Sequence, residues 1–253
     1  MMKLLCDGFS ETGLKRTINQ DSIGMFSGEG EGLFLVSDGM GGHSEGERAS
    51  QAIGEACRQW WEARQEREIR PGFQETMGQL KELLGQASRK IWEDTKEGEI
   101  CGATVVLLWI QEGSYGLIWS GDSRCYLADQ RFLGTRIRQL TIDDVWENQP
   151  ELSQQFSKDE ILSHPNRGRL VRAAGVKKEF TCTAQTGILE RKMLFALCSD
   201  GVYKCMEPEA LKEALKLAIK GDGLARPLAD MENAVYENQA PDNLSCVLVK
   251  VTE

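Results

Sequence analysis

The chain has 253 residues, of which 41% are hydrophobic and 27% charged, and its formal net charge is -9. That length and composition allow a sizeable hydrophobic core, and we expect a single domain over residues 1–253. The acidic balance argues against a nucleic-acid-binding protein, because neutralising backbone phosphates requires a basic face.

The apolar runs along the chain are short. The run Val105–Ile110, one of the longest, is far below the roughly 20 residues that a membrane helix needs. The apolar start of the chain is too short for a signal peptide. We therefore expect a cytoplasmic protein that has no membrane partner.

Eight cysteines are scattered along the chain without a C-x-x-C pair, so neither a zinc site nor a redox motif is indicated. We expect reduced thiols, which serve as small hydrophobic side chains. Five of them fall within apolar, strand-like segments: Cys101, Cys125, Cys182, Cys198 and Cys246.

The first predicted elements are strands over residues 3–9 and 22–26. The apolar run Leu33–Val36 follows and lacks polar alternation, which is typical of a strand buried on both faces. It leads to Asp38, and glycines allow the backbone after it to approach a ligand closely. The sequence therefore predicts a strand that presents a carboxylate at its end. The glycines are Gly39, Gly41 and Gly42.

Two amphipathic helices come next. Ser44 and two nearby acids open the first, and its apolar spacing of three and four continues to about residue 67, before the break at Pro71-Gly72. The second carries an apolar stripe for which core packing is predicted. The stripe consists of Phe73, Met77, Leu80, Leu84, Ala87, Ile91 and Trp92.

Short strands joined by tight turns are predicted from Cys101 onward, and this favours antiparallel meanders over parallel crossovers. We expect strands over residues 101–110, 114–119, 123–127, 135–140, 180–186 and 193–199, with turns at 111–113 and 129–130.

The polar segment 144–169 predicts a helical excursion, or flap, beside the site. Two helices over about 207–220 and 224–238 precede a closing strand, Leu244–Val251. Helices and strands segregated into runs favour an α+β fold.

Carboxylates follow or precede several of these apolar runs. Asp38 and Asp200 each stand before a glycine at the end of such a run, Asp122 follows another, and Asp242 precedes the last strand. An Asp-Gly turn alone is common. Four carboxylates at strand ends, however, suggest one shared site.

Eight short motifs follow one another along the chain: Arg16–Asp21, Ser37–His43, Gly102–Thr104, Gly121–Arg124, Leu140–Asp143, Leu170–Gly175, Ser199–Gly201 and Asp242–Asn243. In this order they resemble the serial motifs of the metal-dependent protein phosphatases of the PP2C (PPM) family. The resemblance spans Arg16 to Val251 and implies two antiparallel sheets flanked by helix pairs, a four-layer α-β-β-α sandwich.

The resemblance also implies metal ligands. Asp38 would bridge two ions, and the Gly39 carbonyl would bind one of them. Asp200 and Asp242 would hold the other. Carboxylate oxygens suit Mg²⁺ or Mn²⁺, and two such ions can activate a shared water.

Two further acids complete the implied site. Asp21 would orient a ligand through water, although Gln20 stands beside it where many members carry Glu. Asp122, with Asp200, resembles the acids that bind a third, weaker ion in bacterial members.

Two residues have implied roles toward the substrate. Arg16 would clamp the phosphate, because its planar fork of donors matches two phosphate oxygens. His43 would protonate the leaving alkoxide. Asp144 stands where many members have His, so its role stays open.

The predicted function is therefore metal-dependent hydrolysis of phosphoserine and phosphothreonine in proteins. The expected partners are phosphorylated protein substrates, a cognate serine/threonine kinase and its targets, and we expect a monomer. Two alternatives remain open. One is a non-catalytic signalling module that binds phosphoprotein, and the other is a metallophosphatase acting on small phosphorylated metabolites.

Overall fold

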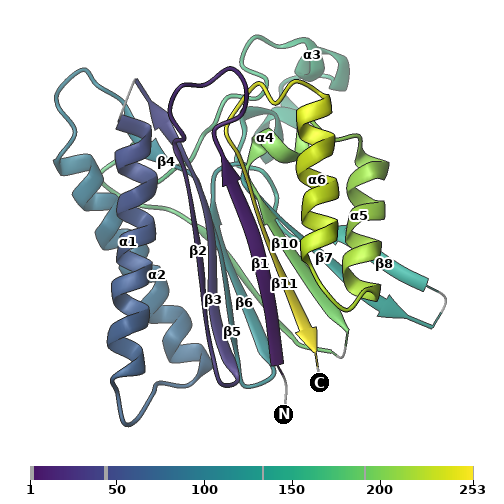
Figure 1. The fold of residues 1–253 in the computed structure, drawn as a ribbon. Helices are drawn as coiled ribbons and strands as arrows, with labels where there is room; N and C mark the ends of the chain where they lie inside the picture. The colour runs from purple at the N-terminus through teal and green to yellow at the C-terminus, as the bar shows by residue number, and fades with distance from the viewer. Residues whose placement is uncertain (1–2, 43–44, 133, 191, 253) are drawn as a thin grey trace.

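Two antiparallel β-sheets lie face to face in the computed structural model, and helices cover the outer face of each sheet (Figure 1). The structure describes residues 3–42, 45–132, 134–190 and 192–252. The expected α+β fold, a four-layer α-β-β-α sandwich, is confirmed.

All neighbouring strands in both sheets are antiparallel, as the meander pattern predicts. The first sheet has the order β1 (Lys3–Glu11), β11 (Leu244–Thr252), β10 (Met193–Cys198), β7 (Arg124–Arg131) and β8 (Gly134–Gln139). The second has the order β2 (Asp21–Gly28), β3 (Glu31–Gly41), β5 (Val105–Gln111), β6 (Ser114–Ser120) and β9 (Thr183–Ile188), and β4 (Cys101–Ala103) pairs with the end of β3.

Strand β3 explains why the central apolar runs lack polar alternation. Leu33 and Leu35 pack on the helix-covered face of the sheet, whereas Phe34 and Val36 pack between the two sheets. Successive side chains on a strand point to opposite faces, and here both faces are covered. Burying one such side chain contributes roughly 1.5–3 kcal/mol. The run therefore stabilises both the packing of the helices on this sheet and the packing of the two sheets on each other.

Two helix pairs form the outer layers (Figure 1). Helices α1 (Glu45–Gln65) and α2 (Phe73–Glu93) cover the second sheet, and α5 (Pro208–Lys220) and α6 (Ala225–Glu237) cover the first. The sequence periodicity predicts all four within a few residues of these bounds. No helix in the described part of the chain is long and apolar enough to cross a membrane.

The predicted core stripe of α2 is wrong at its last position. Trp92 is 40% exposed, because it follows Ile91 directly and successive helical residues point about 100° apart. The members of the stripe that are buried are Phe73, Met77, Leu80, Leu84 and Ile91.

The turn predicted at Asp129-Gln130 is also wrong, because β7 continues through it to Arg131. Asp129 is buried, and it accepts hydrogen bonds from Arg131 Nη2 and Arg136 Nη2, each at 2.7 Å. A carboxylate is costly to bury without such partners. The two arginines therefore allow a sequence that resembles a turn to continue as a strand.

Residues 144–169 form the predicted helical excursion, with α3 projecting at the top of Figure 1. The side chains within it pack on each other, since the Trp146 and His164 rings stack with centroids 4.0 Å apart. The helices are η1 (Trp146–Asn148), η2 (Pro150–Gln154) and α3 (Lys158–Ser163).

All eight cysteines carry free thiols, as the sequence predicts. Burial raises the pKa of the Cys57 thiol to about 12, so this thiol stays protonated near neutral pH. It packs as a small hydrophobic side chain on the buried face of α1.

A buried ion pair connects α1 to β3. The Arg64 side chain is 2% exposed, and its Nε and Nη2 donate to Glu31 Oε2 at 3.1 and 2.8 Å. Its Nη1 donates to Thr76 Oγ1 at 3.2 Å, and the guanidinium lies 4.9 Å from the centroid of the Trp109 ring. A charge buried in apolar surroundings is tolerated only when it is paired and hydrogen-bonded in this way.

Replacing Arg64 by alanine should lower the free energy of unfolding by about 3–5 kcal/mol, because Glu31 then remains buried without its main partner. Urea denaturation followed by tryptophan fluorescence measures the loss. Arg58→Ala, which removes exposed ion pairs from the same helix, is the matched control and should leave the urea midpoint nearly unchanged. Equal losses in the two variants would contradict the role of Arg64.

Candidate active site

Strand pairing gathers the predicted carboxylates at one end of the two sheets. Asp21 on β2 lies directly opposite Asp38 on β3. Asp122 connects β6 to β7, Asp200 comes shortly after β10, and Asp242 comes shortly before β11. The topology therefore brings five acids from distant parts of the chain to one place.

A pocket of about 310 Å³ opens among these acids. Two basic side chains, Arg16 and Lys204, line it as well. Asp21 is buried beside the pocket, where its Oδ2 accepts a hydrogen bond from Ser199 Oγ at 2.8 Å. The acids that line the pocket are Asp38, Asp122, Asp200 and Asp242.

Thr104 holds Asp38 at the point where β3 changes partner from β5 to β4. The Asp38 amide donates to Thr104 Oγ1 at 2.9 Å, and the Thr104 amide donates to the Asp38 carbonyl at 2.8 Å. A hydrogen bond of 2.7 Å joins the hydroxyls of Thr104 and Ser123. The backbone of Asp38 is thus fixed between two segments that frame the pocket.

Asp21 contains a buried oxygen with no partner in the described part of the chain. Its side chain is 8% exposed, and Oδ1 accepts no hydrogen bond there. Leaving a buried polar atom unpaired is costly, and such an atom in a folded protein is often explained by a bound ion or water. Asp21 Oδ1 is therefore suited to contact an ion or a water bound at this end of the sheets.

The carboxylates disfavour each other's ionisation. Burial raises the pKa of Asp38 well above its usual range, and the negative charges of Asp21 and Asp200 raise it further. Burial likewise raises the pKa values of Asp21 and Asp122. Like charges held this close ionise together only when positive charge is supplied nearby.

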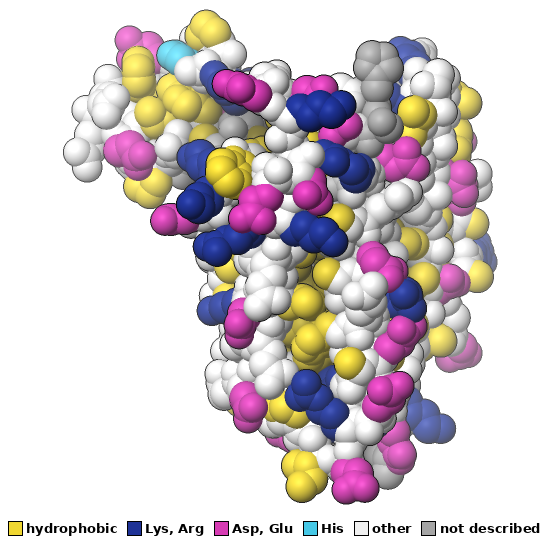
Figure 2. Space-filling view, turned by 90° about the vertical axis from the view of Figure 1, so that its left-hand side faces the viewer, with side chains coloured by type: hydrophobic (Ala, Val, Ile, Leu, Met, Phe, Trp, Pro, Cys, Tyr) yellow, Lys and Arg dark blue, Asp and Glu magenta, His cyan; other side chains and the backbone are white. Residues whose placement is uncertain are grey.

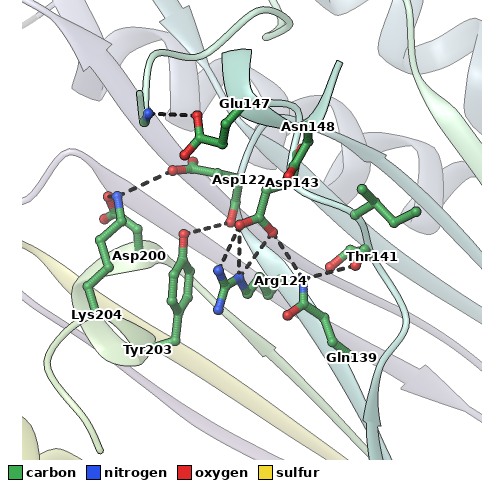
Figure 3. A network of polar contacts seen from close by, with 12 residues as sticks. Asp122, Arg124, Gln139, Thr141, Asp143, Glu147, Asn148, Asp200, Tyr203 and Lys204 are labelled. Carbon is green, nitrogen blue, oxygen red and sulfur yellow. Dashed lines mark hydrogen bonds and ion pairs between the residues drawn. The ribbon is translucent and has the colours of Figure 1, made fainter. Parts of the chain in front are cut away.

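The chain supplies part of that positive charge itself. Arg16 Nε lies 2.8 Å from Asp242 Oδ1, and Arg16 Nη2 donates to Asp242 Oδ2 at 2.9 Å. Lys204 Nζ donates to Asp200 Oδ2 at 2.6 Å and to Asp122 Oδ2 at 3.4 Å (Figure 3). Asp38 and Asp21 have no such partner among the described residues.

Gly39 brings the start of α1 against the pocket. A Cβ atom at this position would lie 2.1 Å from the Gly46 carbonyl oxygen and 2.6 Å from the Gln20 carbonyl oxygen. The Gly39 amide donates to that same Gln20 oxygen at 3.0 Å. Only glycine therefore allows this close approach of three backbone segments.

The donor set fits hydrated divalent cations. Within the described ranges, no three His, Cys, Asp or Glu side chains are arranged to hold one ion by themselves. Mg²⁺ does not require such a cage, because it keeps several waters and is commonly bound through one or two carboxylates. Oxygen ligands without sulfur or imidazole favour Mg²⁺ or Mn²⁺ over zinc or copper.

The structure places seven of the eight predicted site residues together. Arg16 lies at the rim of the pocket, and the remaining six line it or lie beside it. His43 lies outside the described residues. The six are Asp21, Asp38, Gly39, Asp122, Asp200 and Asp242.

Sequence reasoning missed Lys204, because it did not predict the short helix α4 (Asp200–Tyr203). The four-residue spacing from Asp200 to Lys204 is the signal that could have found it, since acid and base at this spacing meet on a helix. The ion pair between these two residues follows that rule.

Asp144 supports the loop that carries Asp122. Its Oδ2 accepts a hydrogen bond from the Gly121 amide at 3.0 Å, and its own amide donates to the Gly121 carbonyl at 3.0 Å. Arg172 forms an ion pair with Asp144 and donates to Thr183 Oγ1 at 2.7 Å. Asp144 and Arg172 thus anchor loops and do not line the pocket.

A larger groove of about 1140 Å³ adjoins the pocket. Met40 and Leu170 line both, so the two spaces lie side by side. Trp92 and residues 95–101 form one wall of the groove.

On the side of the molecule that carries α1 and α2, basic and acidic side chains are interspersed with exposed hydrophobic ones (Figure 2).

Comparison with known proteins gives one consistent result. A family model described as protein phosphatase 2C matches residues 14–249. The protein phosphatase PhpP of Streptococcus pneumoniae is 27% identical over 252 residues, which cover 96% of each chain. The serine/threonine phosphatase stp of Listeria monocytogenes is 26% identical over 212 residues, or 82% of this chain and 81% of that protein.

Solved structures have the same architecture. The crystal structure of the Mycobacterium tuberculosis serine/threonine phosphatase PstP/Ppp superposes with a TM-score of 0.78 at 25% identity and covers 99% of each chain. A structure of the catalytic domain of PstP in complex with two manganese ions superposes with a TM-score of 0.76 at 23% identity and covers all of both chains.

Gly39→Ala should destabilise the protein by at least about 1–3 kcal/mol, because a methyl group there overlaps two backbone carbonyls. Chemical denaturation measures the change. Gly42→Ala is the matched control, since a Cβ at Gly42 meets nothing within 4 Å. If Gly39→Ala unfolds at the same denaturant concentration as Gly42→Ala, the close packing at Gly39 is not essential.

Proposed function

The chain belongs to the protein phosphatase 2C family, and from this premise we propose that it hydrolyses phosphoserine and phosphothreonine in proteins with the help of divalent cations. The observation that carries the proposal is the group of five acids around one pocket, with Asp38 and Asp21 lacking a cationic partner among the described residues. The relatives named as serine/threonine phosphatases support the substrate class.

We assign the cations to the acids as follows. Asp38 would hold both of two Mg²⁺ or Mn²⁺ ions, the Gly39 carbonyl would bind one of them, and Asp200 and Asp242 would hold the other. Asp21 would orient a ligand through water, for which its unpaired Oδ1 is suited. Such ions would supply positive charge and a water of lowered pKa, so no side chain would have to act as nucleophile.

Two side chains act on the substrate in this proposal. Arg16 binds the phosphate, and its ion pair with Asp242 keeps the guanidinium at the pocket before the phosphate arrives. His43 donates a proton to the leaving serine or threonine oxygen. Its position five residues after Asp38 along the chain is compatible with that task.

A non-catalytic phosphoprotein-binding module is the weaker alternative, because all the acids implied by the family motifs are retained around the pocket. A metallophosphatase for small metabolites is disfavoured by the adjoining groove. A metabolite pocket encloses its ligand, whereas a groove adjoins this pocket and offers room for the chain beside a phosphorylated residue.

The wider setting is also part of the proposal. The substrates are targets of a cognate serine/threonine kinase, and the enzyme acts as a monomer in the cytoplasm as one phosphatase domain. Residues 144–169 serve as a flap over the groove, since two of them, Gln149 and Arg169, line it.

Hydrolysis of a phosphothreonine peptide should require Mg²⁺ or Mn²⁺ and stop in EDTA, whereas sugar phosphates and nucleotides should react far more slowly. Asp38→Asn should lose most turnover, because it removes the bridging carboxylate. Asp230→Asn on the exposed face of α6 is the control and should retain full activity. Phosphate release measures each rate. Full turnover in chelator would exclude the two-metal mechanism, and faster release from sugar phosphates would favour the metabolite enzyme.

Ile100→Glu should raise the Michaelis constant for a phosphothreonine peptide about tenfold, because Ile100 is 67% exposed on the groove wall and its burial against a peptide contributes on the order of 1.5 kcal/mol. Hydrolysis of p-nitrophenyl phosphate, which fills only the pocket, should not change.

The control for the groove is Ile69→Glu, which alters an isoleucine that is 88% exposed between α1 and α2. It should affect neither substrate. Parallel steady-state kinetics on both substrates separate the outcomes. A Michaelis constant for the peptide that is the same in Ile100→Glu and the wild type would mean that the groove does not bind substrate.

A further inference from the structure

Lys204 occupies the space between two acids of the pocket. Its Nζ donates to Asp200 Oδ2 at 2.6 Å and to Asp122 Oδ2 at 3.4 Å (Figure 3). These are the two acids that the family resemblance pairs at a third, weaker metal ion. We propose that the Lys204 ammonium replaces that third cation, so that this protein binds two divalent ions and carries the third positive site within its own chain.

The backbone keeps Lys204 beside Asp200. Helix α4 begins at Asp200, and the Lys204 amide donates to the Asp200 carbonyl at 2.9 Å. The two side chains are therefore four residues apart on one helical turn, with the acid first, which is the favourable order for such a pair. The geometry of this helical turn therefore fixes the shorter of the two Lys204 contacts, the one to Asp200.

Tyr203 keeps Asp122 within reach of the same turn. Its hydroxyl donates to the Asp122 carbonyl at 3.1 Å. The guanidinium carbon of Arg124 lies 3.6 Å from the centroid of the Tyr203 ring. Arg124 is held in turn by Asp143, with Nη2 to Oδ2 at 2.7 Å (Figure 3). The loop that carries Asp122 and the turn that carries Lys204 are thus fastened together independently of any metal.

The Lys204 ammonium supplies the positive charge that a third cation would otherwise bring to Asp122 and Asp200. It brings a positive charge and up to three donors to two carboxylates that repel each other. A divalent ion at the same place would have to displace Lys204 and would then lie close to its charge. The donor set around Asp122 therefore does not fit a third ion, whereas the donors around Asp38 fit two.

The consequence for the enzyme is a simpler metal requirement. Activity should be complete once two ions are bound, without a further rise at high metal concentration. This inference rests on the proposed metal-dependent function, so its test counts bound ions and does not depend on turnover.

Titration with Mn²⁺, with free ion measured by electron paramagnetic resonance, counts the ions bound to each protein. The wild type should bind two. Lys204→Gln, which removes the charge and shortens the side chain by one atom, should bind a third ion at least tenfold more tightly than the wild type. Adding Asp122→Asn to that variant should abolish the third ion and leave two.

Lys212→Gln is the matched control, because Lys212 forms an exposed ion pair with Glu209 on α5. It should bind two ions, like the wild type. Equal third-ion binding by the wild type and Lys204→Gln would overturn the role of Lys204 and leave the proposed function intact. Fewer than two ions on the wild type would overturn both. The wild-type count also tests the inference if Lys204→Gln folds poorly, since three ions there would contradict it.

Discussion

Mutual repulsion among carboxylates dominates the electrostatics at one end of the two sheets. Asp21 and Asp38 face each other on paired strands, and burial together with neighbouring negative charge raises the pKa values of both. A fold gains nothing in stability from such a grouping. Its presence at the end of an otherwise apolar sandwich therefore points to function, with cations as the natural partners of the charge.

The sandwich is well suited to hold this charge in place. Side chains of β3 pack in the core on both faces of the sheet, so the strand that carries Asp38 is held rigidly. Thr104 fixes its backbone by two hydrogen bonds, and Gly39 lets the start of α1 approach. Arg16 and Lys204 compensate the acids that lie on loops and on α4, where the support is weaker.

Much of the fold follows from the sequence, because hydrophobic periodicity decides which face of each element is buried. The failures have physical causes. Asp129 resembles a turn residue, yet two arginines that come later in the chain neutralise it within a strand. Trp92 is a residue type common in protein cores, but its position on α2 turns the side chain partly toward solvent.

The site was predictable as a set of acids, since each follows or precedes an apolar run, but its compensating charges were not. Lys204 becomes visible only once α4 is known to start at Asp200, and Thr104 only once β3 is known to change partners there. The change of strand partner joins distant segments and is not encoded in any local pattern, whereas the Asp200–Lys204 pair lies within one helical turn.

Anomalous diffraction from crystals grown with Mn²⁺ tests most directly the claim that these acids form a cation site. Two peaks are expected in contact with Asp38, with Asp200 and Asp242 beside one of them, and the Lys204 ammonium is expected between Asp122 and Asp200. Crystals that bind Mn²⁺ only at surface acids, with no peak at Asp38, would contradict it.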